Sequence, residues 1–145
     1  MRPRLAVPAR RHACVVLAGA ALAPIAGTAA AAQPSQALRL AMRRAAELRD
    51  EAVRAGDQAY GAVVLQGEQI VGEGPSRVVT AADPTAHAEM EALRDAARRL
   101  QRSELSGCVL VSTSRPCRMC ETGAARARIA RMVHGEDFTD AGPPR

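Results

Sequence analysis

The chain has 145 residues, 48% of them apolar and 24% charged, which is the composition of one ordinary globular domain and excludes a largely disordered protein. With one Tyr, one Phe and no Trp, a mechanism that relies on aromatic stacking of bases is disfavoured. The net charge of +5 comes mainly from four arginines before residue 12, because the other 16 arginines face 15 acidic residues and there is no lysine.

Residues 1–32 have the three-part pattern of a secretory signal peptide. A basic segment that ends in Arg10 and Arg11 precedes an apolar run, 13–27, and a small-residue stretch with several Ala-x-Ala cleavage sites follows. A membrane anchor is the alternative, but the run is shorter than the roughly 20 residues of a span and Pro24 interrupts it. The arginine pair resembles a twin-arginine leader, so we expect a periplasmic or secreted protein.

The remaining residues, 33–145, are expected to form one domain that begins with a helix. Apolar side chains recur at helical spacing across 35–56, and Gly56 is a typical stop. The expected buried stripe of this helix is Leu38, Met42, Ala45, Leu48 and Val53. Two short strands then follow, 59–66 and 69–74, which the spacing predicts to be a hairpin.

Helices and strands alternate over the rest of the chain. A helix is predicted over 86–101, a buried strand over 108–113, a third helix over 117–128 and a strand near 129–135. The second helix is expected to bury Met90, Leu93, Ala97 and Leu100, and the last ten residues to form a frayed tail. This order predicts the α/β class, as a three-layer α/β/α sandwich with a mixed sheet.

Two short motifs, each at the start of a predicted helix, carry the candidate chemistry. One places His87 two residues before Glu89, and the other is a Pro-Cys-x-x-Cys run with Cys117 and Cys120. Free N–H groups and the helix dipole favour thiolate over thiol at such a position. Three protein ligands leave the fourth tetrahedral position of zinc for water, so the pattern predicts a catalytic Zn²⁺ held by the histidine and both cysteines.

Glu89 is the candidate for proton transfer. Zinc lowers the pKa of its water towards neutrality, and attack of the resulting hydroxide on an amino-bearing ring carbon releases ammonia. Protons must then move from the water to the ring nitrogen and to the departing amine, which needs a carboxylate that is not itself a ligand. Two residues from His87, Glu89 can reach the water without binding the metal.

The combination His-Ala-Glu and Pro-Cys-Arg-Met-Cys resembles the cytidine-deaminase-like zinc hydrolases. The resemblance covers about residues 38–135, and the stretches 61–66, 83–96 and 127–135 are similar to guanine deaminases and tRNA adenosine deaminases. It implies the same roles, with zinc held by His87, Cys117 and Cys120 and protons moved by Glu89.

The resemblance further implies a zinc-dependent hydrolytic deaminase of a nucleobase or nucleoside, with guanine favoured over cytosine and adenine derivatives. A small molecule is the expected partner rather than a nucleic acid, because the domain after the leader has a net charge of only +1. A domain of this size gains from burying surface against a copy of itself, so we expect a homodimer. Relatives commonly continue further, so a fold shortened at its C-terminus is expected.

Three positions depart from the family pattern. Ser76 stands where the family usually has the Asn that contacts substrate, and it is our candidate substrate-binding residue. Arg115 replaces the usual Glu before Pro-Cys, and Arg126 replaces an aromatic residue of the third helix. None of these changes a zinc ligand, so they bear on the pocket rather than on the metal.

Two alternatives stay open. The departures and the short C-terminus favour a non-catalytic, zinc-stabilised binding module, while Cys117 and Cys120 alone are also consistent with an exported thiol-disulfide protein. Cys108 lies in a strand pattern and is expected to be a buried apolar residue. His134 ends a strand and is given no role.

The leader generates the first testable prediction. Replacing Arg10 and Arg11 by lysine should stop export if the protein uses the twin-arginine route, which carries folded proteins and would protect zinc-bound thiolates. Cell fractionation and immunoblotting measure this. Unchanged export of the double variant would show that the chain leaves by another route.

Overall fold

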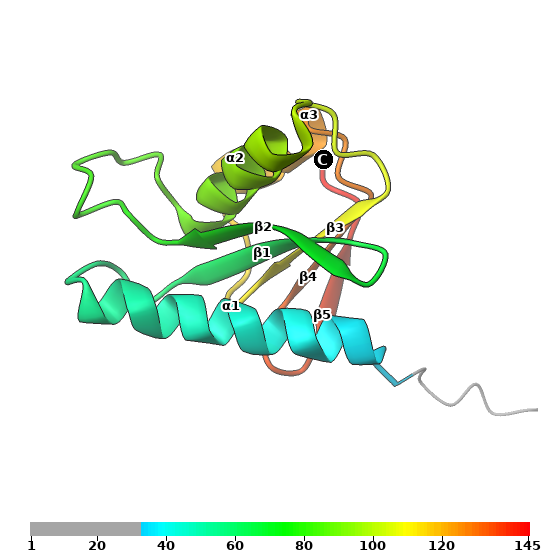
Figure 1. Ribbon diagram of the computed structural model, residues 1–145, viewed down its shortest axis with the longest axis horizontal. Coiled ribbons are helices and arrows are strands. Elements are labelled where there is room, and N and C mark those ends of the chain that lie inside the picture. Colours follow the sequence, from blue (N-terminus) through cyan, green and yellow to red (C-terminus); the bar gives the residue numbers. More distant parts are fainter. Residues whose placement is uncertain (1–32) are drawn as a thin grey trace, which may run out of the picture. The chain divides into compact units, whose positions relative to one another are not determined.

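A five-stranded sheet with the order β2-β1-β3-β4-β5 forms the centre of the domain (Figure 1). The computed structural model describes residues 33–145, so the predicted leader lies outside the described residues. The strands are β1 Gly61–Gln66, β2 Gln69–Pro75, β3 Cys108–Ser112, β4 Arg131–His134 and β5 Thr139–Gly142. Only β3 and β4 pair in parallel and the other neighbours are antiparallel, which confirms the predicted mixed sheet.

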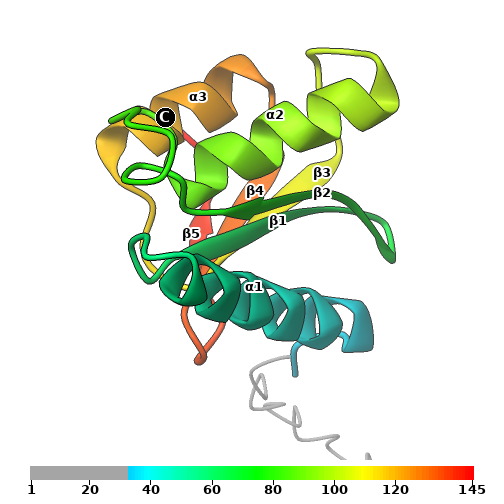
Figure 2. The same ribbon diagram turned by 60° about the vertical axis from the view of Figure 1, so that its left-hand side comes forward.

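Three helices cover the two faces of the sheet, which confirms the three-layer sandwich. The helix α1, Gln36–Arg54, lies on one face, and α2, Ala88–Leu100, lies with α3, Arg118–Arg126, on the other (Figure 2). Strand side chains alternate between the two cores, so Val63 and Val111 pack under α1 while Val64 and Leu110 pack under α2 and α3. Among residues 33–145, no helix has the length and hydropathy needed to cross a membrane.

The first helix begins and ends where the sequence predicts. The Ser35 hydroxyl accepts the backbone N–H of Leu38 at 3.1 Å, and Gly56 follows the helix with a φ of 81°. One predicted core residue was wrong, because Val53 is 54% exposed and Ala52 is buried in its place. The helical repeat places Ala52, four residues after Leu48, on the buried face.

The second helix lies unusually close to β2, and this shifts its buried stripe. A Cβ atom on Gly72 would lie 2.4 Å from the carbonyl oxygen of Ala92, and one on Gly74 would lie 2.2 Å from that of Ala88. The small face with Ala92 and Ala96 therefore meets the sheet. Of the predicted stripe, Leu93 is buried, whereas the other three residues, Met90, Ala97 and Leu100, are only half-buried.

The end of the chain corrects another expectation. Residues 136–145 contain β5, which pairs antiparallel with β4, and Arg131 bonds Asp140 across that pair at 3.0 Å. The reversal between the strands uses Gly135 and Phe138, both with positive φ. Apolar and polar residues alternate only weakly in this short segment, which explains why its sequence did not predict a strand.

Candidate metal centre and active site

The predicted zinc ligands lie at the N-termini of two helices on the same face of the sheet. His87 is the N-cap residue of α2 and Cys117 is that of α3, and neither side chain caps its own helix. Cys120 lies in the first turn of α3 and is fully buried. Because the N-cap side chains are not used for capping, they are available to a metal ion.

The three donor atoms form a nearly equilateral triangle. The His87 Nδ1 atom lies 3.7 Å from the sulfur of Cys117 and 3.7 Å from that of Cys120, and the two sulfurs are 3.6 Å apart. Tetrahedral zinc, with Zn–S of about 2.3 Å and Zn–N of about 2.0 Å, separates two sulfurs by about 3.8 Å and sulfur from nitrogen by about 3.6 Å. These residues therefore fit zinc without rearrangement, and they are the one group of this kind among residues 33–145.

The position of His87 argues against the thiol-disulfide alternative. Both cysteines are free and their sulfurs are 3.6 Å apart, which a reduced redox pair would share, but the Nδ1 atom of His87 lies 3.7 Å from each sulfur. A zinc site needs such a third donor, whereas a redox pair does not. Cys108, the third free cysteine among residues 33–145, is fully buried in the core, which confirms its expected structural role.

Glu89 lies beside the triangle without belonging to it. Its carboxylate is buried and its Oε2 atom accepts the Cys120 thiol at 3.6 Å. Burial raises the pKa of Glu89 above its ordinary value, and burial together with the charge of Glu89 raises the pKa of Cys120. A bound cation reverses both effects, because it stabilises thiolate and carboxylate in the same small volume.

A cavity of about 550 Å³ opens onto these groups. Its volume lies within the range of small-molecule sites. Its lining residues are Gln58, Tyr60, His87, Glu89, Ser114, Arg115 and Cys117. Although the composition is poor in aromatic residues, the one tyrosine of the chain, Tyr60, lies in the wall of this cavity.

Ser76, the candidate substrate contact, does not line this cavity. It is 2% exposed, and its hydroxyl donates to Asp57 Oδ1 at 2.8 Å. It lines a different cavity, between the end of α1 and the loop after β2. The bond from its hydroxyl to Asp57 connects the loop after β2 to the loop before β1. A substrate contact through Ser76 stays a prediction.

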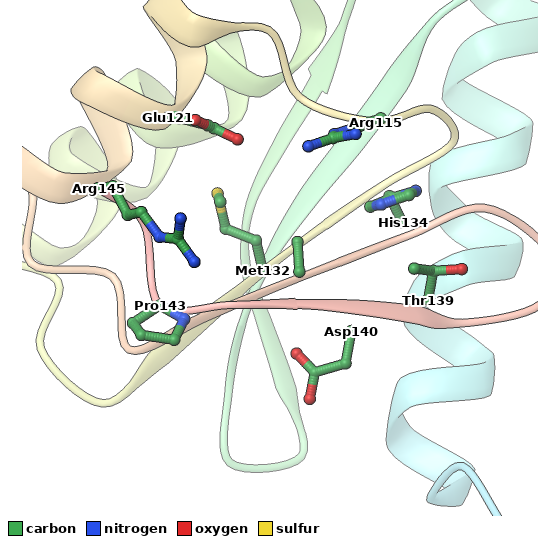
Figure 3. A pocket seen from close by; sticks show the side chains of 9 residues that line it. Arg115, Glu121, Met132, His134, Thr139, Asp140, Pro143 and Arg145 are labelled. Carbon is green, nitrogen blue, oxygen red and sulfur yellow. The ribbon is translucent and has the colours of Figure 1, made fainter.

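The other two departures from the family pattern, Arg126 and Arg115, differ in their position relative to the metal-site cavity. Arg126 is exposed on α3, away from the metal-site cavity. Arg115 lines that cavity and also a neighbouring one of about 390 Å³, where its guanidinium group points inward together with the carboxylate of Glu121 and the guanidinium group of Arg145 (Figure 3). His134, which was given no role, lines the neighbouring cavity and not the metal site. Mixed acidic and basic groups there indicate no single class of charged ligand.

Sequence reasoning missed Gln58, Tyr60 and Ser114. The first two precede β1 and the third follows β3, and antiparallel pairing of Ala62 with Ser112 brings those ends together. The hairpin prediction located β1 itself. The pairing of β1 with β3 could not be predicted, because no short sequence pattern indicates which distant strand lies beside β1.

Comparison with known proteins agrees with this geometry. The family model described as "Cytidine and deoxycytidylate deaminase zinc-binding region" matches residues 35–136. Guanine deaminase of Bacillus subtilis is 38% identical over 101 residues, which are 69% of this chain and 65% of that protein. Its X-ray structure superimposes with a TM-score of 0.64 and 36% identity, covering 67% of this chain and 62% of that one.

Two further relatives have other names. A tRNA-specific adenosine deaminase of Haemophilus influenzae is 41% identical over 65% of this chain and 55% of that protein. A tRNA(Ile)-lysidine synthase of Deinococcus deserti is 42% identical over 76% of this chain and 21% of that protein. The chain thus spans less than two thirds of the length of each of these relatives.

The chain belongs to the cytidine and deoxycytidylate deaminase family, and its residues 35–136 form the zinc-binding region of that family. The donor triangle described above lies within that region and could hold its zinc ion.

Removing zinc should destabilise the domain, increasingly so at higher pH. Without the metal, the raised pKa of Glu89 gives stability that is fully present below its ordinary pKa and lost as pH rises through the raised one, whereas the raised pKa of Cys120 acts only above the ordinary thiol range. Thermal unfolding with and without a chelator, from about pH 5 to about pH 8, measures this, and metal analysis should find about one zinc per chain. A zinc-free protein with Cys117 disulfide-bonded to Cys120 would contradict the prediction.

Proposed function

We propose that the protein is a zinc-dependent hydrolytic deaminase that releases ammonia from a nucleobase or nucleoside, with guanine as the favoured substrate. The observation that carries the proposal is the placement of Glu89, a buried carboxylate next to the donor triangle and in the wall of the same cavity. A purely structural zinc site needs no such group, whereas hydrolysis at a ring carbon does.

The residues divide the chemistry between them. Zinc, when bound, activates the attacking water. Glu89 takes a proton from that water and passes it to the ring nitrogen next to the attacked carbon. Glu89 then takes the second proton from the hydroxyl group now on that carbon and gives it to the amino group, so that the carbon–nitrogen bond breaks, ammonia leaves and a carbonyl remains. Because Glu89 is buried beside the donor triangle without being one of its three donors, its carboxylate is free both to accept and to release protons.

The low net charge of the domain supports a small-molecule substrate rather than an RNA. The domain after the leader carries a net +1, and seven of its arginines are already in ion pairs. These are Arg44, Arg49, Arg94, Arg98, Arg99, Arg128 and Arg131. Binding a folded RNA draws on many phosphate contacts, for which this surface has little surplus charge. We also propose that the protein is exported to the periplasm or secreted, where it meets scavenged bases rather than cytoplasmic tRNA. We propose that it works as a homodimer.

The Glu89→Gln variant should keep its zinc and lose turnover by about 10³-fold or more, because glutamine preserves the shape but cannot carry protons. Ammonia release from guanine, cytosine, cytidine and adenine, and from an anticodon stem-loop with adenosine 34, measures this. Zinc content and gel filtration of the same samples report metal binding and oligomeric state. Undiminished activity of the variant would remove Glu89 from the mechanism.

Failure of the wild-type chain to release ammonia from any of these, while zinc is bound, would favour the binding-module alternative. Turnover of the stem-loop alone would overturn the small-substrate proposal.

A further inference from the structure

One carboxamide side chain lies in the wall of the metal-site cavity, and it belongs to Gln58. The chain contains no asparagine, so glutamines are its only carboxamides. Gln58 is exposed, and among the described residues its side-chain amide makes no hydrogen bond within the protein. The amide is therefore available to a bound molecule.

The backbone that carries Gln58 is held from both sides. Its N–H donates to Asp57 Oδ1 at 2.8 Å, and its carbonyl accepts the N–H of Tyr60 at 2.8 Å. The Tyr60 carbonyl in turn accepts the N–H of Ser76 at 3.0 Å. These bonds fix the direction in which the side chain leaves the loop, although the side chain itself stays free.

Asp57 anchors this loop to the segment that follows β2. Its Oδ2 atom accepts the N–H of Val79 at 3.0 Å and both the N–H and the hydroxyl of Thr80, at 2.8 and 2.9 Å. Although desolvation opposes the charged form, the backbone bonds from Thr80 and Gln58 and the hydroxyl bond from Ser76 hold the pKa of Asp57 well below its usual range. A carboxylate with so many donors is a fixed anchor, and it places Gln58 at the cavity.

We propose that Gln58 determines substrate specificity by pairing with a lactam, the adjacent ring N–H and carbonyl of the base, and that Asp57 positions it. This inference rests on the proposed function and adds the part of the base that is recognised. Guanine has such a lactam beside its amino-bearing carbon, so the group that reacts and the group that is recognised are neighbours on one ring.

Donor and acceptor chemistry selects Gln58 among the lining residues. A carboxamide presents one donor and one acceptor side by side in a plane, which matches a lactam with two parallel hydrogen bonds. Arg115 has donors only, and Tyr60 and Ser114 each offer a single hydroxyl oxygen. Gln58 is thus the side chain of this cavity that can satisfy both lactam atoms at once.

The test uses guanine and 2-aminopurine, which keeps the amino group but lacks the lactam N–H and the lactam carbonyl. The measured values are kcat and KM for guanine and the inhibition constant of 2-aminopurine against guanine deamination, in zinc-loaded protein. We expect Gln58→Met, which keeps the length of the side chain, to raise the KM for guanine about 10- to 100-fold with a smaller change in kcat. The inhibition constant of 2-aminopurine should stay within about threefold, since the lost bonds were never made to it.

Two matched variants complete the design. Asp57→Asn should raise the KM for guanine in the same direction but by less, because the side chain is displaced rather than removed. Gln69→Ala is the control, since it removes an exposed carboxamide at the opposite end of the β1–β2 hairpin and should change nothing. Zinc content and thermal unfolding confirm that each variant is folded.

The outcomes separate the two proposals. No ammonia from any base by the wild-type protein defeats the proposed function, and this inference with it. Activity on guanine with an unchanged KM in Gln58→Met, or an equal rise for guanine and 2-aminopurine, defeats only the lactam assignment. Turnover of bases other than guanine, with guanine inert, also defeats it.

Discussion

The architecture of the site follows from one constraint, that three donor atoms from two helices must lie within 3.7 Å of one another. Without a metal this arrangement disfavours the ionised forms, because a buried thiol and a buried carboxyl group share a small volume and burial raises the pKa of each. Zinc reverses that balance by stabilising the thiolates. The close packing of α2 on Gly72 and Gly74 of β2 then holds His87 at the required place relative to α3.

The wall of the cavity depends on a second, metal-independent set of contacts. Asp57 connects the loop before β1 to the loop after β2, and that second loop leads into His87 at the start of α2. The same anchor therefore supports a zinc ligand on one side and Gln58 on the other. Ser76, which the sequence predicts to contact substrate, is a donor to this anchor, so it contributes to the shape of the site.

Sequence alone predicted the part of the site that short-range spacing determines. The zinc ligands lie at helix starts, where two or three residues of separation fix which side chains meet, and the structure brings all three together as expected. The buried stripe of α2 was misjudged because close approach to two glycines favours alanine over Met90 and Leu100. Gln58 and Tyr60 could not be predicted, because their proximity to Ser114 in the cavity wall arises from the pairing of β1 with β3, between residues far apart in the chain.

Zinc K-edge X-ray absorption on the purified protein tests the central claim most directly, because it reports the ligand atoms without any assumption about substrate. The account predicts two sulfur ligands at about 2.3 Å and two nitrogen or oxygen ligands at about 2.0 Å, one from His87 and one from water. A closed shell of protein ligands with no water position, or no bound zinc, would contradict a catalytic metal centre in this chain.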